Sequence, residues 1–324
     1  MIRVIIDADP GVDDAAAILL ALASPEVDVL GLSIVSGNVP LTDAVANACK
    51  VVGVSGRRNL PIHAGASAPL IRDQIFGKYA AIGTFADALV PPTDVVPEVE
   101  HAVRFLVRTL RAAASAGDPI TICAIGPMTN LALALVHHPE VAQGIARIVT
   151  MGGTFRTPGH RVPWAEFNVL ADPHAADVVY RSGVPIVAIP LDLTTQALFT
   201  HEHFTSFRER GGAAGAALGH LFTAFDRSDV ARYGRPGGPI HDAATLAWLI
   251  RPELFESRAA TVGVQLTGEM LGATYADYDG VLHRASNAQV ATRIDEAGFI
   301  TLLTERIAFY GDRAAGSLAP GVPI

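Results

Sequence analysis

Short apolar runs rich in Val and Ile alternate with longer segments of helical periodicity along the first part of the chain. Strands that are apolar on both faces and separated by helices are typical of a mostly parallel central sheet with helices on both faces. The pattern therefore predicts an α/β fold. The predicted strands are 2–7, 27–36, 119–125, 145–151 and 184–190, and the predicted helices are 13–23, 41–54, 99–115, 128–136 and 172–182.

The pattern changes in the last quarter of the chain, where short alternating runs predict further strands at 258–266, 272–278 and 287–293. A last helix is expected at 295–310. The segment 66–97 is irregular and is a candidate for a flexible flap. No linker or shift in composition divides the chain, so we expect a single domain over residues 1–324.

Polar segments follow the predicted strands at the point where each strand ends. In open α/β sheets, ligands bind beyond the carboxyl ends of the strands. We therefore expect these segments to meet at one edge of the sheet and to form one site. They are 7–14, 36–38, 124–130, 151–153 and 190–192, joined by 239–243 at the start of an apolar helix.

The segment 7–14 carries four Asp residues within eight positions. Carboxylates this close raise one another's pKa and destabilise the fold unless a positive charge lies among them. Arg3 is the only cation before Lys50, so the pattern predicts a bound hard cation such as calcium or magnesium. The alternative is an acidic turn at the positive end of a helix, which uses only one or two of the four carboxylates.

Composition narrows the class of partner. Half of the residues are hydrophobic, 17% are charged, and the formal net charge is −8. This balance argues against nucleic acid or an anionic membrane as the partner, although a local basic patch stays possible. Cys49 and Cys123 lie in apolar stretches without metal-like spacing and are interpreted as reduced core thiols of a cytoplasmic protein. The first strand begins almost at Met1, so no signal peptide is expected.

The segment Asp-Ala-Asp-Pro-Gly-Val-Asp-Asp at 7–14 resembles the motif Asp-Thr-Asp-Pro-Gly-x-Asp-Asp of the inosine-uridine nucleoside hydrolase family. The segment 165–168 (Ala-Glu-Phe-Asn) and the pair His241-Asp242 extend the resemblance over most of the chain. The resemblance implies a Rossmann-like nucleoside hydrolase fold. It also implies a calcium-dependent enzyme of nucleoside catabolism and base salvage, assembled as a homodimer or homotetramer, that cleaves ribonucleosides to ribose and free base.

By the same resemblance, carboxylates of Asp9, Asp14 and Asp242 and the backbone carbonyl of Ile125 would hold the calcium ion. Such a set suits a large hard cation that prefers oxygen ligands. The metal would lower the pKa of a water molecule, and Asp9 would take its proton as general base. The resulting hydroxide would attack the anomeric carbon through an oxocarbenium-like transition state.

The resemblance places Asp13 and Asn38 on one side of the ribose, Glu166 and Asn168 on the other, and Met151 beneath it. Each has a plainer interpretation. Asn38 follows a glycine and is equally typical of a turn, and Met151 is typical of a core. Glu166 and Asn168 point the same way if their segment is extended, but a hydrogen-bonded pair within a loop would have the same spacing.

Three positions bear on the base and one on the sugar 5′-hydroxyl. His241 is the candidate to protonate or orient the leaving base, and Tyr233 resembles an aromatic participant of pyrimidine-preferring members, although either side chain could simply pack. Ile82 stands where many members carry a His near the base. His160 stands where an Asn commonly touches the sugar 5′-hydroxyl. These departures leave the preference between purine and pyrimidine open.

Two other functions compete with hydrolysis. A nucleoside- or ribose-binding protein without turnover would need no general base, and the presence of Asp9 argues against it. An aspartate-nucleophile phosphatase also places Asp-x-Asp after its first strand, but it needs a Lys and a Ser or Thr at later strand ends. Lys50 and Thr129 do not fall convincingly at such positions.

Overall fold

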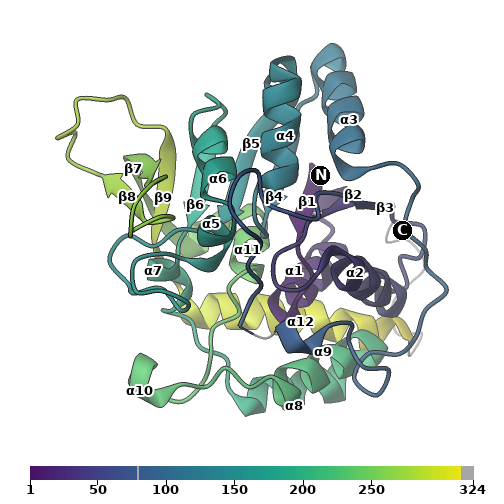
Figure 1. Ribbon diagram of the computed structural model, residues 1–324. Helices are drawn as coiled ribbons and strands as arrows, with labels where there is room; N and C mark the ends of the chain where they lie inside the picture. Colours follow the sequence, from purple (N-terminus) through teal and green to yellow (C-terminus); the bar gives the residue numbers. More distant parts are fainter. Residues whose placement is uncertain (79, 315–324) are drawn as a thin grey trace.

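The computed structural model describes residues 1–78 and 80–314. Within them, nine strands form one sheet in the order β3-β2-β1-β4-β5-β6-β9-β7-β8 (Figure 1). The first strand in the sequence therefore lies inside the sheet, between β2 and β4. The strands are β1 (Ile2–Ala8), β2 (Val27–Ile34), β3 (Ile62–Ala64), β4 (Ile120–Ala124), β5 (Ile145–Met151), β6 (Ile186–Ile189), β7 (Phe255–Val264), β8 (Thr274–Asp277) and β9 (Ala288–Ile294).

The sheet from β3 to β9 is parallel, and β7 runs antiparallel to both β9 and β8. This arrangement confirms the predicted mostly parallel α/β fold. In β1, Asp7 lies opposite Ser33 of β2 and Ala124 of β4, so the ends of three strands are in register. The polar segments that follow these strands meet at one edge of the sheet as a result.

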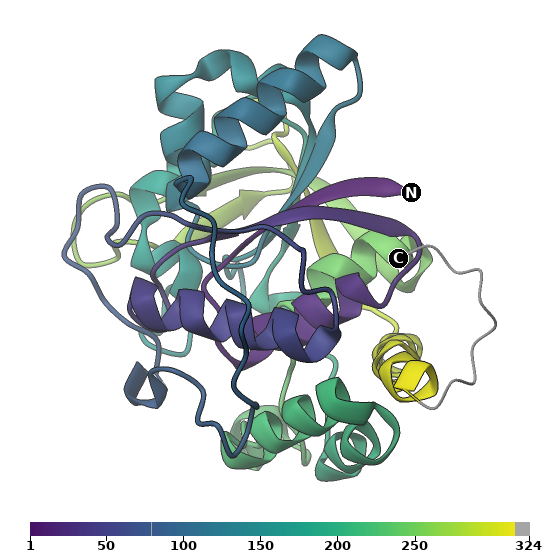
Figure 2. The same cartoon turned by 90° about the vertical axis from the view of Figure 1, so that its right-hand side faces the viewer.

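Helices cover both faces of the sheet (Figures 1 and 2). Alternate residues of β1 belong to different cores: Val4 and Ile6 pack with α1, α2 and α11, while Ile5 packs with α3, α4 and α6. The longer helices are α1 (Val12–Leu22), α2 (Leu41–Ser55), α3 (Ala102–Ala116), α4 (Thr129–His137), α6 (Pro173–Tyr180), α8 (His201–Arg210), α9 (Gly212–Ala224), α11 (Ala243–Ile250) and α12 (Glu296–Ala314). Shorter helical turns are η1 (Ala80–Ile82), η2 (Pro139–Gly144), α5 (Phe167–Ala171), α7 (Leu191–Thr194), α10 (Val230–Tyr233) and η3 (Pro252–Leu254).

The helix α12 packs across α1, which follows the Asp-rich segment. The Tyr310 hydroxyl donates to the backbone carbonyl of Leu19 at 2.7 Å and is buried. Arg306 forms an ion pair with Glu26 at 2.6 Å, just beyond the end of α1. The two ends of the described chain thus share one core. Among the described helices, none combines enough length with enough apolar character to cross a bilayer.

Several elements differ from the sequence-based prediction. The helix expected from residue 99 begins at Ala102, because His101 caps its N-terminus and Val99 is fully exposed. The strand β3 and the pair α8–α9 were not predicted. In α9, Gly215 and Gly219 lie so close to α8 that an added Cβ would approach its backbone carbonyls to 2.2 and 2.5 Å. Glycine is a poor helix former and weakens the helical pattern in the sequence. The glycines that this close packing requires therefore make α9 difficult to predict from sequence.

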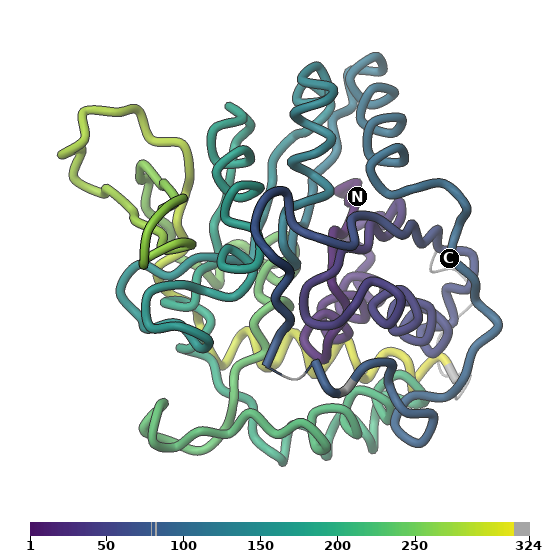
Figure 3. The backbone as a smooth tube through the Cα atoms, in the orientation of Figure 1, coloured from purple at the N-terminus to yellow at the C-terminus, as the bar shows by residue number. Residues whose placement is uncertain are grey.

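The long segment between β3 and α3, traced in dark blue in Figure 3, has little regular structure, as predicted. Of this expected flap, Tyr79 lies outside the described residues. Its C-terminal part is anchored on α2. The Asn47 side chain accepts the N–H of Phe85 at 2.7 Å and donates to the carbonyls of Pro10 at 3.0 Å and Gly83 at 3.2 Å. Lys50 is buried and donates to Phe85 O at 2.5 Å and to Asp87 at 2.6 Å.

Candidate active site

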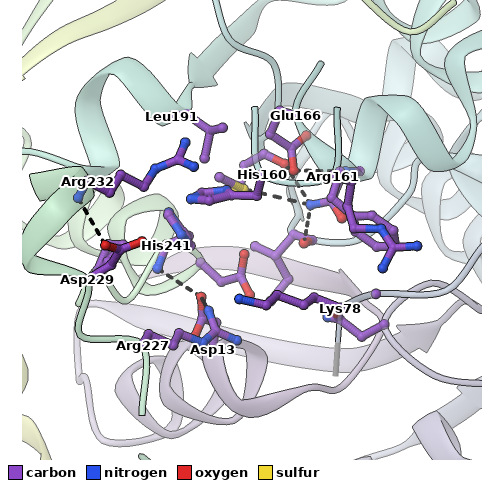
Figure 4. A pocket seen from close by; sticks show the side chains of 18 of the residues that line it. Asp13, Lys78, His160, Arg161, Glu166, Leu191, Arg227, Asp229, Arg232 and His241 are labelled. Carbon is purple, nitrogen blue, oxygen red and sulfur yellow. Dashed lines mark hydrogen bonds and ion pairs between the residues drawn. The ribbon is translucent and has the colours of Figure 1, made fainter. Parts of the chain in front are cut away.

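A cavity of about 430 Å³ opens beyond the carboxyl ends of the parallel strands. Ten of the twelve residues that the sequence analysis assigned to the site line it (Figure 4). The other two, Asp9 and Asp14, are fully buried beside it and contact the lining residue Asn38. The ten lining residues are Asp13, Asn38, Ile125, Met151, His160, Glu166, Asn168, Tyr233, His241 and Asp242.

The loop between β1 and α1 is held by its own carboxylates. The backbone N–H of Asp9 donates to Oδ1 of Asp14 at 3.1 Å, and that of Gly11 donates to Oδ2 at 3.0 Å. These bonds fix the turn from strand to helix. They also place Asp14 at the N-terminus of α1, where the helix dipole favours negative charge. The acidic-turn interpretation therefore accounts for Asp14 but not for the other carboxylates.

Asn38 ties the second strand end to the Asp-rich loop. Its backbone N–H donates to Oδ2 of Asp9 at 2.6 Å, and its side-chain amide donates to Asp9 O at 3.3 Å and to Asp14 Oδ2 at 3.2 Å. An added Cβ on Gly37 would come within 2.1 Å of the Asp9 carboxylate, and one on Gly126 within 2.8 Å. Both glycines therefore allow the backbone to enclose this carboxylate. Asp9 Oδ1 is buried and has no hydrogen-bond partner among the described residues.

Burial dominates the electrostatics of these carboxylates. It raises the pKa of Asp9 and of Asp242 well above the usual value, and the charge of Asp14 adds to the rise for both groups. Burial also raises the pKa of Asp14 to about 6. Carboxylates that are close and poorly solvated repel one another in their ionised form. This is the repulsion that the sequence predicted.

One positive charge within the cluster was missed by sequence analysis. Arg227, from the segment between α9 and α10, donates through Nη1 to Asp13 Oδ2 at 2.5 Å. By contrast, Arg3 pairs with Asp118 at 2.6 Å. The expectation that the chain supplies no positive charge among these carboxylates is therefore wrong, because a residue 214 positions from Asp13 supplies a guanidinium.

Asp13 and His241 are linked directly. The backbone N–H of His241 donates to Asp13 Oδ2 at 3.1 Å, and Asp13 Oδ1 is buried without a partner in the described chain. Nδ1 of His241 lies 2.7 Å from the Thr194 hydroxyl. Burial lowers the pKa of His241 to about 3, and Arg227 and Arg232 add to this effect. The ring is therefore neutral near pH 7.

Glu166 and Asn168 occupy the opposite wall. The Glu166 carboxylate caps α5 and accepts backbone N–H groups of Asn168 at 2.8 Å, Val169 at 3.2 Å and Gly153 at 3.2 Å. The Asn168 amide donates to the carbonyls of Ile125 at 2.8 Å and Met151 at 3.0 Å. The bonded-pair interpretation is thus correct for the loop, and both side chains also line the cavity. Burial raises the pKa of Glu166 to about 7.

The segment around His160 and the segment around Tyr233 meet over the remaining side of the cavity. His160 Nε2 lies 3.3 Å from the Tyr233 hydroxyl, and the rings of His160 and His241 stand edge to face at 5.4 Å. Arg232 donates to the carbonyl of Pro158 at 2.5 Å and more weakly to that of Gly159. His160, which departs from the family motif, therefore stands beside Tyr233 and His241, which resemble it. Ile82 belongs to η1, and its side chain lies outside the described part of the structure.

The sequence analysis missed much of the cavity wall. Leu191 lines it, whereas Asp192 of the same strand end binds the backbone of the 155–157 loop. The only sequence signal for the rest was a dense alternation of Asp and Arg over 226–235. The further lining residues are Gly77, Lys78, Arg161, Phe167, Leu191, Asp226, Arg227, Ser228, Asp229, Arg232 and Pro239.

The expected metal ligands partly fit an oxygen-coordinated divalent cation. The donors have the right chemistry, they repel one another, and Asp9 Oδ1 is unpartnered in the described chain. However, no group of three or more His, Cys, Asp or Glu side chains in residues 1–78 and 80–314 stands in the geometry of a metal centre. In this arrangement Asp9 Oδ2 and both Asp14 oxygens accept hydrogen bonds. A cation bound by these oxygens would have to replace those bonds.

Comparison with known proteins identifies the family of this chain. The family model for inosine-uridine preferring nucleoside hydrolase matches residues 4–301. The chain therefore belongs to this family of ribonucleoside hydrolases, whose members bind a metal ion. It is 40% identical over 311 residues to the pyrimidine-specific ribonucleoside hydrolase RihA of Citrobacter koseri, covering 95% of this chain and 98% of that protein.

Two further relatives support the assignment. The RihA protein of Escherichia coli K12 is 39% identical, with the same coverage of both chains. The structure of a purine-preferring ribonucleoside hydrolase from Gardnerella vaginalis superposes with a TM-score of 0.86 at 28% identity and covers 96% of this chain and 99% of its own. The resemblance seen in the sequence is confirmed, and the chain is a nucleoside hydrolase.

Proposed function

We propose that this enzyme hydrolyses the N-glycosidic bond of ribonucleosides with a calcium ion held by Asp9, Asp14, Asp242 and the carbonyl of Ile125, and with Asp9 as general base. The observation that carries this proposal is the buried carboxylate Asp9, whose Oδ1 has no partner in the described chain. It lies next to a cavity of about 430 Å³, which is within the usual range for a small-molecule site.

The cavity walls supply the grip on the sugar. Asp13 Oδ1 and the amide oxygen of Asn38 offer acceptors on one side, and the Glu166 carboxylate and the amide oxygen of Asn168 offer acceptors on the other. A ribose hydroxyl can donate to a carboxylate or to an amide oxygen. Met151 is 3% exposed and lines the floor, so it serves as both core and contact surface.

The chemistry that a divalent cation supplies when bound is a lower pKa for the attacking water. Asp9 would take a proton from the attacking water at Oδ1, the oxygen that has no partner in the described chain. Positive charge develops on the sugar ring as the bond to the base breaks. The carboxylates of Asp13 and Glu166 face the cavity that holds this charge and stabilise it.

His241 orients the leaving base and donates a hydrogen bond to it. If the Thr194 hydroxyl donates to Nδ1, then Nε2 carries the proton and is the nitrogen available to a ligand. Tyr233, bonded to His160, lines the same cavity. The names of the RihA relatives at 39–40% identity support a preference for pyrimidine ribonucleosides.

The rival functions have weaker support. A phosphatase would need Lys50 and Thr129 at the site, but Lys50 anchors the flap and Thr129 donates to Asp172 at 2.8 Å. A protein that binds nucleosides without cleaving them needs no general base, so it would not need the buried carboxylate of Asp9 in that role. Hydrolysis is therefore the function that the geometry supports best.

The test is sugar release from uridine, cytidine, inosine and guanosine by protein stripped with a chelator and then given calcium or magnesium. We expect ribose release from the pyrimidine nucleosides that depends on added cation and is fastest with calcium. Calorimetric binding of uridine without ribose release would favour the binding-protein alternative. Equal turnover in chelator and in calcium would remove the cation from the proposal.

A further inference from the structure

The contact between Arg227 and Asp13 joins two parts of the chain that lie 214 residues apart. Asp13 belongs to the first turn of α1, and Arg227 to the segment that leads into α10. Figure 4 shows Arg227, Asp13 and His241 grouped on one side of the cavity, away from Arg161. Arg227 is the charged group of this wall that touches a carboxylate assigned to the sugar.

The two oxygens of Asp13 have different surroundings. Oδ2 accepts from Arg227 at 2.5 Å and from the backbone N–H of His241 at 3.1 Å. Oδ1 is buried and accepts no hydrogen bond from the described residues. A carboxylate held at one oxygen by two donors cannot rotate freely, so its second oxygen has one direction in which to accept a ligand.

The position of Arg227 is itself fixed. An added Cβ on Gly238 would come within 2.7 Å of the Arg227 backbone, so the two segments are in close contact. Gly238 in turn exchanges two backbone hydrogen bonds with Phe199, at 2.9 and 3.0 Å. The Arg227 side chain is only 20% exposed. The guanidinium is therefore held in a fixed position in the cavity wall.

We infer that Arg227 is a positioning residue for ribose recognition: it holds Asp13 Oδ2 so that Oδ1 is presented to one hydroxyl of the sugar. The inference rests on the proposed function for the identity of the ligand, and it adds a residue that sets discrimination between ribose and deoxyribose. A charge-assisted hydrogen bond is roughly twice as strong as a neutral one, so loss of the guanidinium frees the carboxylate to turn.

A purely structural role would have a different signature. Arg232 lies in the same segment and also lines the cavity, but it holds the carbonyls of Pro158 and Gly159 and not Asp13. If Arg227 only kept the segment in place, its loss would resemble the loss of Arg232. Arg232→Met is therefore the matched control for Arg227→Met.

The experiment compares uridine with 2′-deoxyuridine and 3′-deoxyuridine in the calcium-loaded enzyme. For each deoxynucleoside, the measured quantity is the ratio of kcat/KM for uridine to kcat/KM for that substrate. In the wild type we expect one of the two ratios to be about 10 to 100, the usual effect of leaving a charged buried acceptor unpaired. In Arg227→Met that ratio should fall about tenfold, while the ratio for the other hydroxyl should stay unchanged. Arg232→Met should slow all three substrates equally.

Two further variants separate positioning from misfolding. Arg227→Lys keeps one charged donor and should restore part of the discrimination. In an Asp13→Asn background, Arg227→Met should have little further effect on the ratio, because residues that act through one another are not additive. Equal losses on all three substrates, or full additivity with Asp13→Asn, would overturn the inference.

A binding measurement keeps this inference apart from the proposed hydrolysis. Calorimetric titration of the calcium-loaded protein with D-ribose, 2-deoxy-D-ribose and 3-deoxy-D-ribose needs no turnover. If nucleosides are not cleaved but Arg227→Met loses preference for one sugar hydroxyl, hydrolysis fails and the inference stands. If cleavage proceeds and neither sugar preference nor substrate ratio changes, the inference fails alone.

Discussion

The wild type should lose folding stability as the pH rises, and replacing Glu166 with Gln should remove this loss. Burial raises the pKa of this carboxyl from 4.5 to about 7, which corresponds to roughly 3 kcal/mol. The folded protein thus holds the proton more tightly than the unfolded chain. The stabilisation that this proton brings is present below about pH 4.5, falls as the pH rises, and is absent above about pH 7.

The Gln side chain stays neutral, and its one oxygen can take the place of Oε2, which accepts the N–H groups of Val169 and Gly153. The bond from Asn168 to Oε1 is lost at every pH and does not affect the slope. We therefore expect the free energy of unfolding of the wild type, measured against Glu166→Gln, to fall by about 2–3 kcal/mol between pH 5 and pH 8. Urea denaturation at four pH values, in chelator and without nucleoside, measures this difference. The same change at Glu100 is the control, because Arg108 lowers the pKa of that carboxyl below 4.5. Glu100 is then ionised in both the folded and the unfolded state from pH 5 to pH 8, so this difference should stay constant across that window.

The KM for uridine should depend on the same ionisation of Glu166. A sugar hydroxyl donates best to an ionised carboxylate, so KM for uridine should begin to rise below about pH 7 in the wild type. This part of the rise should be absent in Glu166→Gln. Stability curves that run parallel from pH 5 to pH 8 would refute the argument that burial raises this pKa.

Three further outcomes are expected. Asp9→Asn keeps side-chain volume and one oxygen, so uridine turnover should fall about 10²- to 10⁴-fold, more than calorimetric calcium affinity does; near wild-type turnover would remove Asp9 as the base. His241→Ala should slow uridine far more than p-nitrophenyl riboside, whose leaving group needs no proton, and equal losses would mean that His241 only orients or packs. Calcium at one hundred times its Kd should stabilise the fold by about 2.7 kcal/mol; a Tm that is the same in calcium and in chelator would argue against a site at Asp14 and Asp242.

The sequence predicted those parts of the molecule that depend on local pattern. The main parallel strands and the helices beside them follow from apolar periodicity, and the ends of β1, β2 and β4 place Asp9, Asn38 and Ile125 together. The strand β3 has three residues, which is too short for a periodic signal. The helix α9 owes its position to glycines that fit against α8, and only the folded structure reveals that fit.

The missed half of the site depends on contacts between distant segments. Arg227 and Arg232 lie in an irregular stretch whose position is set by the pairing of Gly238 with Phe199 and by bonds to Pro158. No local rule connects these residues with Asp13. Lys50 illustrates the same difficulty, because nothing in the sequence distinguishes a buried lysine that anchors a loop from an ordinary one on a helix surface.

The packing of α12 on α1 has a consequence for how the enzyme is made. Helix α1 carries Asp13 and Asp14 and is synthesised long before α12, yet Tyr310 of α12 donates to its Leu19 carbonyl and Arg306 pairs with Glu26 just beyond it. During translation, almost three hundred residues are added after α1 before α12 is complete. Until then the apolar face of α1 lacks that cover, so the nascent chain is exposed to chaperones and to misassembly over this interval.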